Sequence, residues 1–182
     1  MWLWIILAII ILIIIYAFIL YNNFISLDNK VKEAFSTMDV YLKKRWDLIP
    51  NLVETVRGYA KYEEETLTRV TKLRNTVYNK MTNDEKIINN EELSSDVSKI
   101  MALKEAYPEL KANENFKELS KDLSKIEEDI ANSRKYYNGT VRTYNDKIEM
   151  VPSNIVAGIF GFKTRTMFEV DAAERENVKV KF

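Results

Sequence analysis

A stretch of the chain with no charged side chain constrains the fold more than any other feature. From Trp2 to Tyr21 the sequence is dominated by Ile and Leu. A helix needs about 20 such residues to cross roughly 30 Å of hydrocarbon. Trp2 and Trp4 at one end, and Tyr21 at the other, stand where amphipathic rings prefer the membrane interfaces. We therefore expect residues 2–21 to contact membrane lipid as a single-pass anchor.

A cleaved signal peptide is the alternative for this stretch. No basic residue precedes the apolar run, the run is longer than the usual signal core, and no A-x-A-like site follows it. We therefore favour an uncleaved anchor. Lys30 and Lys32 follow the run, and such a positive flank favours the cytoplasmic side. The expected localisation is the cell membrane, with the rest of the chain in the cytoplasm.

The composition favours an all-α fold without catalytic chemistry. Four Gly and three Pro in 182 residues are few for a many-stranded sheet. Lys+Arg and Asp+Glu both total 27, so the neutral chain has no electrostatic reason to bind nucleic acid. His and Cys are absent, which removes the commonest general base and metal ligands. The acidic runs 63–65 and 127–129 are expected to be solvated, because consecutive residues do not share a helix face. We expect no catalytic, cofactor-binding or metal site and no cofactor.

Apolar residues that recur every three or four positions predict an antiparallel bundle of about four long helices. The first continues from the anchor to Pro50, because the residue before a proline avoids the helical region. The second runs from Pro50 to about Val77, and residues 79–90 are expected to form a polar loop. The third covers 91–106, and Asn113 is expected to cap the fourth. The core stripe of the fourth helix is Phe116, Leu119, Leu123, Ile126, Ile130, Tyr137, Val141, Tyr144 and Ile148.

The lengths of the last two helices do not match. At 1.5 Å per residue the fourth would be about 55 Å long and the third about 24 Å. Either the third helix begins upstream, inside the expected loop, or the fourth overhangs or bends near Gly139. The predicted organisation is an anchor over 1–22, a helical bundle over 23–150, and an apolar C-terminal segment over 151–182 that packs on the bundle or near the membrane.

Polar and aromatic residues crowd around the expected turn at Pro50. The members of this cluster are Arg45, Trp46, Asp47, Asn51 and Glu54. Capping by Asp47 and an ion pair between Arg45 and Glu54 explain them as local structure. Exposed tips with charged and aromatic groups are also typical contact sites, so the cluster is a candidate for partner contact.

The C-terminal segment is apolar where a bundle would be expected to end. Because helices joined by turns alternate in direction, the fourth helix should return toward the membrane. Phe160 and Phe162 then become candidates for contact with the membrane interface. The alternative is that these aromatic residues cover the open end of the bundle.

Several motifs resemble those of the LemA family, a bacterial group with an N-terminal transmembrane helix and a helical soluble domain. They are YLKKRWDLIPNLVETVRGYAKYE at 41–63, AYPELKAN at 106–113, the pattern Arg134, Tyr137, Asn138, Tyr144 and Asn145, and the tail residues Pro152, Gly161, Phe162 and Phe168. Tyr62 stands where the family commonly has His, so any role of that imidazole does not carry over. The resemblance implies a membrane-anchored protein with no established biochemical activity.

These observations favour a protein-interaction or scaffold module at the bacterial cell membrane, with a protein partner that the sequence does not identify. The alternative is a self-assembling coiled-coil membrane protein, because heptad-like stripes also pack between chains in a homo-oligomer. An enzyme that uses carboxylates alone is a third possibility, which the absence of His and Cys disfavours.

Overall fold

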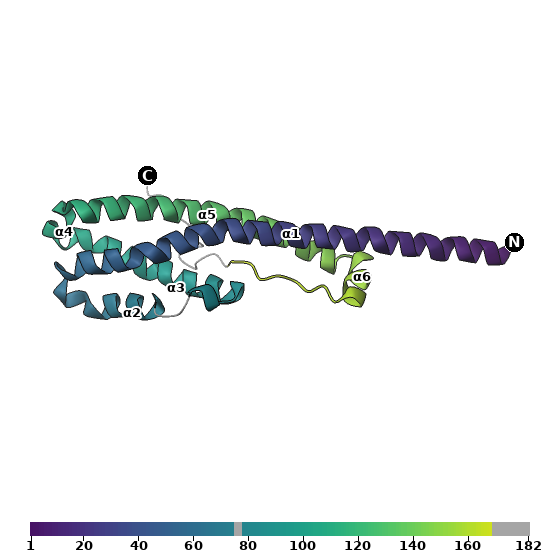
Figure 1. The fold of residues 1–182 in the computed structure, drawn as a ribbon, viewed down its shortest axis with the longest axis horizontal. Helices are drawn as coiled ribbons and strands as arrows, with labels where there is room; N and C mark the ends of the chain where they lie inside the picture. Colours follow the sequence, from purple (N-terminus) through teal and green to yellow (C-terminus); the bar gives the residue numbers. More distant parts are fainter. Residues whose placement is uncertain (75–77, 169–182) are drawn as a thin grey trace, which may run out of the picture. The chain divides into compact units, whose positions relative to one another are not determined.

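The computed structural model describes residues 1–74 and 78–168, and it contains helices and no strand in that part of the chain (Figure 1). The helices are α1 (Trp2–Arg57), α2 (Glu64–Arg74), α3 (Asn83–Ala102), α4 (Pro108–Ala112), α5 (Glu114–Glu149) and α6 (Ser153–Phe160). The predicted all-α class with a long apolar N-terminal helix is confirmed. Val77, expected near the end of the second helix, lies outside the described residues.

The chain forms two compact units. Unit 1 combines Met1–Ser36 with Arg134–Met167, and unit 2 includes Thr37–Ser133. The buried apolar residues of unit 1 are Leu20, Phe24, Val31, Ala34, Phe35, Tyr137, Val141, Tyr144, Ile148, Val156 and Ala157. Those of unit 2 include Met38, Leu42, Trp46, Ile49, Leu52, Val56, Leu67, Val70, Ile87, Leu93, Val97, Ile100, Leu110, Phe116, Leu123 and Ile130. The expected division at residues 22 and 150 stays a prediction.

The predicted break at Pro50 is wrong, because α1 continues through this residue to Arg57. A proline inside a helix costs about 3 kcal/mol, since it lacks the N–H and its ring clashes with the carbonyl four residues earlier. Ile49, Leu52 and Val53 beside it are buried. Burying each such side chain contributes about 1.5–3 kcal/mol, so their packing outweighs the cost of the proline.

The turn that ends α1 lies instead at Gly58. The backbone N–H groups of Tyr59 and Ala60 both donate to the carbonyl of Val56, each at 2.9 Å. A 3₁₀ turn over Lys61–Glu63 then leads into α2. Gly58, which falls inside the second helix expected from Pro50 to about Val77, therefore separates α1 from the 3₁₀ turn.

The expected loop over 79–90 is also wrong, because α3 begins at Asn83. Thr82 and Glu85 form a capping box: the Thr82 hydroxyl accepts from the Glu85 N–H at 3.2 Å, and the Thr82 N–H donates to the Glu85 carboxylate at 2.7 Å. These two bonds satisfy N–H groups that a helix start leaves free. Ile87 and Asn90 are buried, so this polar stretch still has an inward face.

The third helix does begin upstream, inside the expected loop, as the first alternative stated. The 20 residues of α3, about 30 Å, are nevertheless still shorter than the 36 residues of α5, about 54 Å, so the two lengths remain unequal. The predicted cap of the fourth helix is confirmed, because the Asn113 side-chain oxygen accepts from the Phe116 N–H at 2.9 Å. Within the predicted stripe of α5, Leu119 and Ile126 are partly exposed and the other members are buried.

Replacing Pro50 by Ala is expected to stabilise the protein. Ala supplies the missing N–H and removes the clash, so the free energy of unfolding should rise by about 1–3 kcal/mol. Thermal unfolding of the detergent-solubilised chain, followed by circular dichroism, measures the change. Asn51→Ala is the matched control, with a gain below about 0.7 kcal/mol from helix propensity alone. An unchanged or lower melting temperature in Pro50→Ala would contradict a continuous α1.

Candidate functional site

The most buried charge described in unit 2 is the guanidinium of Arg45 on α1, which is 1% exposed. Its Nη1 donates to Glu127 Oε1 on α5 at 2.8 Å and to the hydroxyl of Ser94 on α3. Its Nη2 donates to the carbonyl of Asn90 at 3.0 Å and also to the side-chain oxygen of that residue. One side chain therefore joins three helices through charge-assisted bonds.

A second polar group lies beside this arginine. Asp39 on α1 accepts from the hydroxyl of Tyr78 at 2.5 Å and pairs with Lys86 of α3 at 2.9 Å. The Lys86 ammonium lies 4.6 Å from the centre of the Tyr78 ring. The centres of the Trp46 and Tyr78 rings lie 5.3 Å apart. Burial and the bond to Asp39 raise the pKa of the Tyr78 hydroxyl well above its ordinary value, so this group stays a hydrogen-bond donor at neutral pH.

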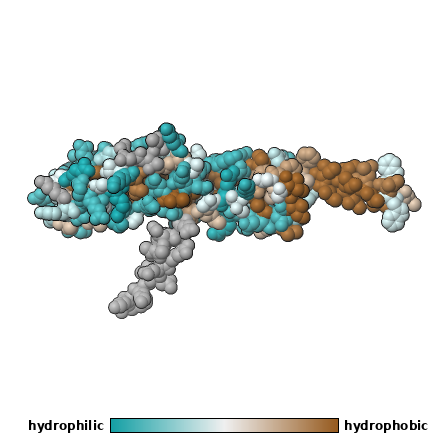
Figure 2. Space-filling model, turned by 90° about the horizontal axis from the view of Figure 1, so that it is seen from below, coloured by the Kyte–Doolittle hydropathy of each residue, from teal (hydrophilic) through white to brown (hydrophobic). Residues whose placement is uncertain are grey.

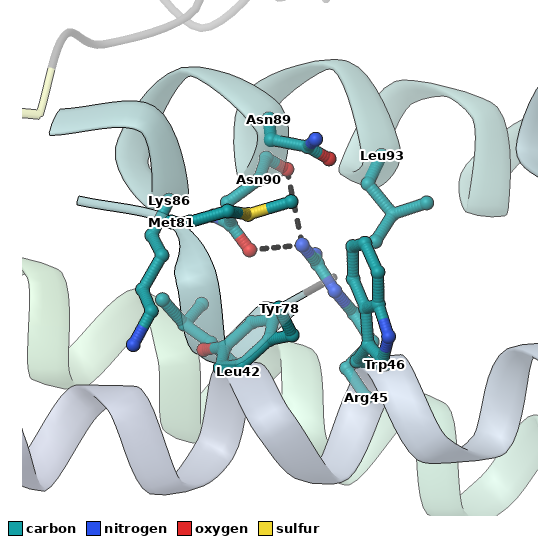
Figure 3. A pocket seen from close by; sticks show the side chains of 9 residues that line it. All are labelled: Leu42, Arg45, Trp46, Tyr78, Met81, Lys86, Asn89, Asn90 and Leu93. Atoms are coloured by element: carbon teal, nitrogen blue, oxygen red, sulfur yellow. Dashed lines mark hydrogen bonds between the residues drawn. The ribbon is translucent and has the colours of Figure 1, made fainter. Parts of the chain in front are cut away.

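These side chains enclose a cavity of about 10 Å³ (Figure 3). Its lining residues are Leu42, Arg45, Trp46, Tyr78, Met81, Lys86, Asn89, Asn90 and Leu93. A space of this size holds about one water molecule, whereas substrate pockets span about 300–1,000 Å³. This cavity is therefore too small for a metabolite, and the polar side chains around it join helices of unit 2.

An ion pair joins α2 to α3 in the same unit. Arg69 donates to both oxygens of Asp96, from Nε at 2.6 Å and from Nη2 at 2.5 Å, and Lys99 reaches the same carboxylate at 3.2 Å. The Arg69 hydrogen bonds lower the pKa of the Asp96 carboxyl below its ordinary value, against the effect of burial. Asp96 is therefore a carboxylate committed to holding the two helices together.

A shallow groove of about 510 Å³ runs between α1 and α5 on the surface of unit 2. Its lining residues are Asn51, Glu54, Thr55, Asn115, Glu118, Leu119 and Asp122. Three of these are carboxylates and none is a cation. Within the part of the chain that the structure describes, Glu54, Glu118 and Asp122 form no ion pair. We refer to this surface as the acidic groove.

Unit 1 has its own buried carboxylate, Asp28 on α1. Arg165 donates to it at 2.8 Å and Lys32 pairs with it at 2.7 Å. Burial opposes ionisation of this carboxyl, but the bonds from Lys32 and Arg165 outweigh burial and hold its pKa below the ordinary value. Asn145 of α5 fixes the backbone of Arg165 from the other side, donating to its carbonyl and accepting from its N–H, both at 2.9 Å.

Some members of the predicted partner-contact cluster are buried and others are exposed. Arg45 and Trp46 are buried, so they do not stand on an exposed turn, and Arg45 pairs with Glu127 rather than with Glu54. Asp47 lies inside α1 and pairs with Lys43, so its expected capping role is wrong. Asn51 and Glu54 are exposed and line the acidic groove. Contact with a partner stays a prediction for all five residues.

The two predicted membrane-interface residues lie against the N-terminal helix of unit 1. The Phe160 ring centre lies 4.9 Å from that of Tyr21, and the Phe162 ring centre lies 4.9 Å from that of Phe24. Phe160 remains exposed, whereas Phe162 is partly buried. Sequence reasoning placed them near the anchor but missed Asp28 and Arg165, whose pairing spans 137 positions of sequence.

Comparison with known proteins identifies the family. The model of the LemA family matches residues 34–182. The chain belongs to the LemA family. The protein LemA of Metamycoplasma hominis is 27% identical over 161 residues, which cover 86% of this chain and 72% of that protein. The magnetosome proteins MamQ 1 and MamQ 2 of Paramagnetospirillum magneticum are each 34% identical over 73 residues, covering 40% of this chain but only 27% of those proteins.

Removing the Arg45 charge is expected to destabilise unit 2. Arg45→Met keeps the apolar stem but leaves Asn90, Ser94 and Glu127 without their donor, which should lower the free energy of unfolding by about 3 kcal/mol. Lys44→Met at the neighbouring exposed position is the control and should change it by less than about 0.5 kcal/mol. Equal melting temperatures for the two variants would refute the role of the buried guanidinium.

The ion-paired carboxylate of Asp96 is expected to make the protein less stable in acid. Because the folded-state pKa of Asp96 is depressed, the unfolded chain binds more protons near pH 4, and stability falls as the pH drops below about 4. Asp96→Asn should therefore lower the melting temperature at pH 6 and flatten its further decline toward pH 3. Asp122→Asn, which alters an exposed carboxylate of the acidic groove, is the control and should keep the wild-type decline. A wild-type decline in Asp96→Asn would contradict the assignment.

Proposed function

We propose that this chain is a membrane-tethered module that binds a protein partner, with the acidic groove of unit 2 as the contact surface. Its N-terminal helix is compatible with a membrane anchor, and the LemA family is a membrane-associated family. The side chains before Leu20 are exposed, apart from the partly exposed Ala17, and about 19 residues of helix cover roughly 28 Å. That length matches the hydrocarbon core of a bilayer.

The use of charge supports binding rather than catalysis. The most buried charged side chains, Arg45, Asp96 and Asp28, are paired with partners on other elements of their own unit. Among the described residues, no group of three His, Cys, Asp or Glu side chains is placed to hold a metal ion. The charges of the interior are thus engaged in joining helices, and the groups available for recognition lie on the surface.

The acidic groove is the surface that best fits a partner. A second groove, of about 480 Å³, lies between α2 and α3, but Arg69 lines it together with Glu91, Glu92 and Asp96, so this groove has charges of both signs. In the acidic groove Glu54, Glu118 and Asp122 surround the half-buried Leu119. A helical segment with one apolar side chain and flanking Lys or Arg complements this arrangement. The single observation that supports the proposal is that the lining of this groove has carboxylates and no cation around the apolar side chain of Leu119.

Photocrosslinking in the native membrane tests the proposal. A benzoylphenylalanine at position 119, inside the groove, should give a discrete crosslinked protein, and the same group at position 121 should not. Glu118→Lys/Asp122→Lys should reduce the crosslinking at 119 by roughly tenfold or more, because it reverses charges that face the partner.

The pattern of products decides between the alternatives. Crosslinking at 119 that survives the charge reversal would contradict an acidic contact surface. A product with twice the mass of the chain would favour self-assembly instead. Equal yields at 119 and 121 would mean that the groove is not a selective contact surface.

A further inference from the structure

Helix α6 is apolar on the side that it buries and also on the side that it exposes. Val156 and Ala157 are buried within unit 1, together with Ser153. Ile155 and Ile159, one turn apart, are 61% and 74% exposed. Apart from Ser153 and Asn154 in its first turn, α6 has no polar side chain, and a helix with apolar residues on both its buried and its exposed side suits a protein core or a membrane. The outward side of α6 therefore lacks the apolar surroundings that its sequence suits.

The aromatic contacts fix where α6 lies along the N-terminal helix. Its last residue, Phe160, packs on Tyr21, and Phe162 packs on both Tyr21 and Phe24. Leu20 is the first buried side chain of α1. The end of α6 is therefore level with the point where the bare apolar run of α1 stops, which is where a bilayer interface would lie if residues 2–21 span it.

Further apolar side chains are exposed near α6 in unit 1. Met150 and Val151, just before α6, are also exposed. Figure 2 shows hydrophobic surface along the N-terminal helix and again on the adjoining part of unit 1. Lys163, directly after Phe162, is exposed and can reach lipid phosphate groups with its flexible stem.

We propose that α6 lies in the boundary between lipid headgroups and acyl chains, with Ile155 and Ile159 in contact with the bilayer that α1 crosses. The inference rests on the membrane anchorage in the proposed function and adds a second lipid contact to it. A bilayer is the occupant because the surface of α6 adjoins the apolar run of α1, which a bilayer covers as a whole. A protein partner on α6 alone would have to occupy the space of the surrounding headgroups.

The absence of cysteine from the chain allows a direct test with single labels. The full-length variants Ile10→Cys, Ile155→Cys, Ile159→Cys and Arg142→Cys, each with a nitroxide label, are reconstituted in vesicles of phosphatidylcholine and phosphatidylglycerol. Power saturation in electron paramagnetic resonance then compares the accessibility of each label to oxygen, which concentrates in lipid, with that to a water-soluble nickel chelate. Arg142 is an exposed position on α5 of the same unit and serves as the aqueous reference.

The expected result is a ratio of oxygen to nickel accessibility at 155 and 159 that is several-fold above that at 142 and below that at 10. A ratio at position 10 as low as that at 142 would contradict the membrane anchorage itself and with it the proposed function. A lipid ratio at 10 with aqueous ratios at 155 and 159 would overturn only the inference for α6. Shielding of 155 and 159 from both reagents would also overturn it, because a second copy or another protein would then cover α6.

Discussion

The guanidinium of Arg45 is the group around which unit 2 is arranged. A buried charge costs several kcal/mol unless it is paired and fully hydrogen-bonded. The partners of its Nη1 and Nη2 come from α3 and α5, so these two nitrogens are hydrogen-bonded only when both helices are docked on α1 in one register. A shift of one residue would turn Glu127 by about 100° around the axis of α5 and leave the guanidinium without its counter-ion. Apolar contacts tolerate such shifts more easily, because they are not directional. The polar joint therefore specifies the arrangement that the surrounding Leu, Ile and Val side chains stabilise.

The sequence predicted the elements whose signals are local. The long apolar N-terminal helix follows from an uninterrupted apolar run, and the start of α5 follows from Asn113 three positions before Phe116. The break at Pro50 was a wrong prediction. A proline inside a helix costs about 3 kcal/mol, and the burial of the neighbouring side chains, which offsets this cost, is not visible in the sequence alone. The loop over 79–90 was wrong for a different reason. Thr82 and Glu85 have the spacing of a capping box, so the signal for the start of α3 was present, but the polar composition that followed obscured it.

The error at Pro50 also explains why the candidate site was only partly predicted. If the helix is continued through the proline, the positions 38, 42, 45, 49, 52 and 56 form one stripe at steps of three and four, and Arg45 occupies a core position of that stripe. With a turn assumed at Pro50, the same arginine and Trp46 looked like exposed residues at a tip. The hydrogen-bond partners of Arg45 could not have been found from helical spacing, since they lie 45 to 82 positions away in the sequence. Asn51 and Glu54 were assigned to the surface correctly, because neither lies on that stripe.

The distribution of charge bears on how the proposed anchor and the proposed contact surface would act together. The chain is neutral overall, with 27 cationic and 27 anionic residues, so it has no net charge to attract a partner from a distance. The acidic groove acts only locally, because charges on an exposed surface are screened beyond about 8 Å at physiological salt. A short-range surface of this kind binds weakly when both proteins diffuse in three dimensions. Confinement to a membrane compensates for this weakness, since a partner held in the same bilayer meets the groove at a high effective concentration without any additional contact. In the proposed function, the N-terminal helix as an anchor therefore supplies the encounter with the partner, and the acidic groove needs to supply only the selection.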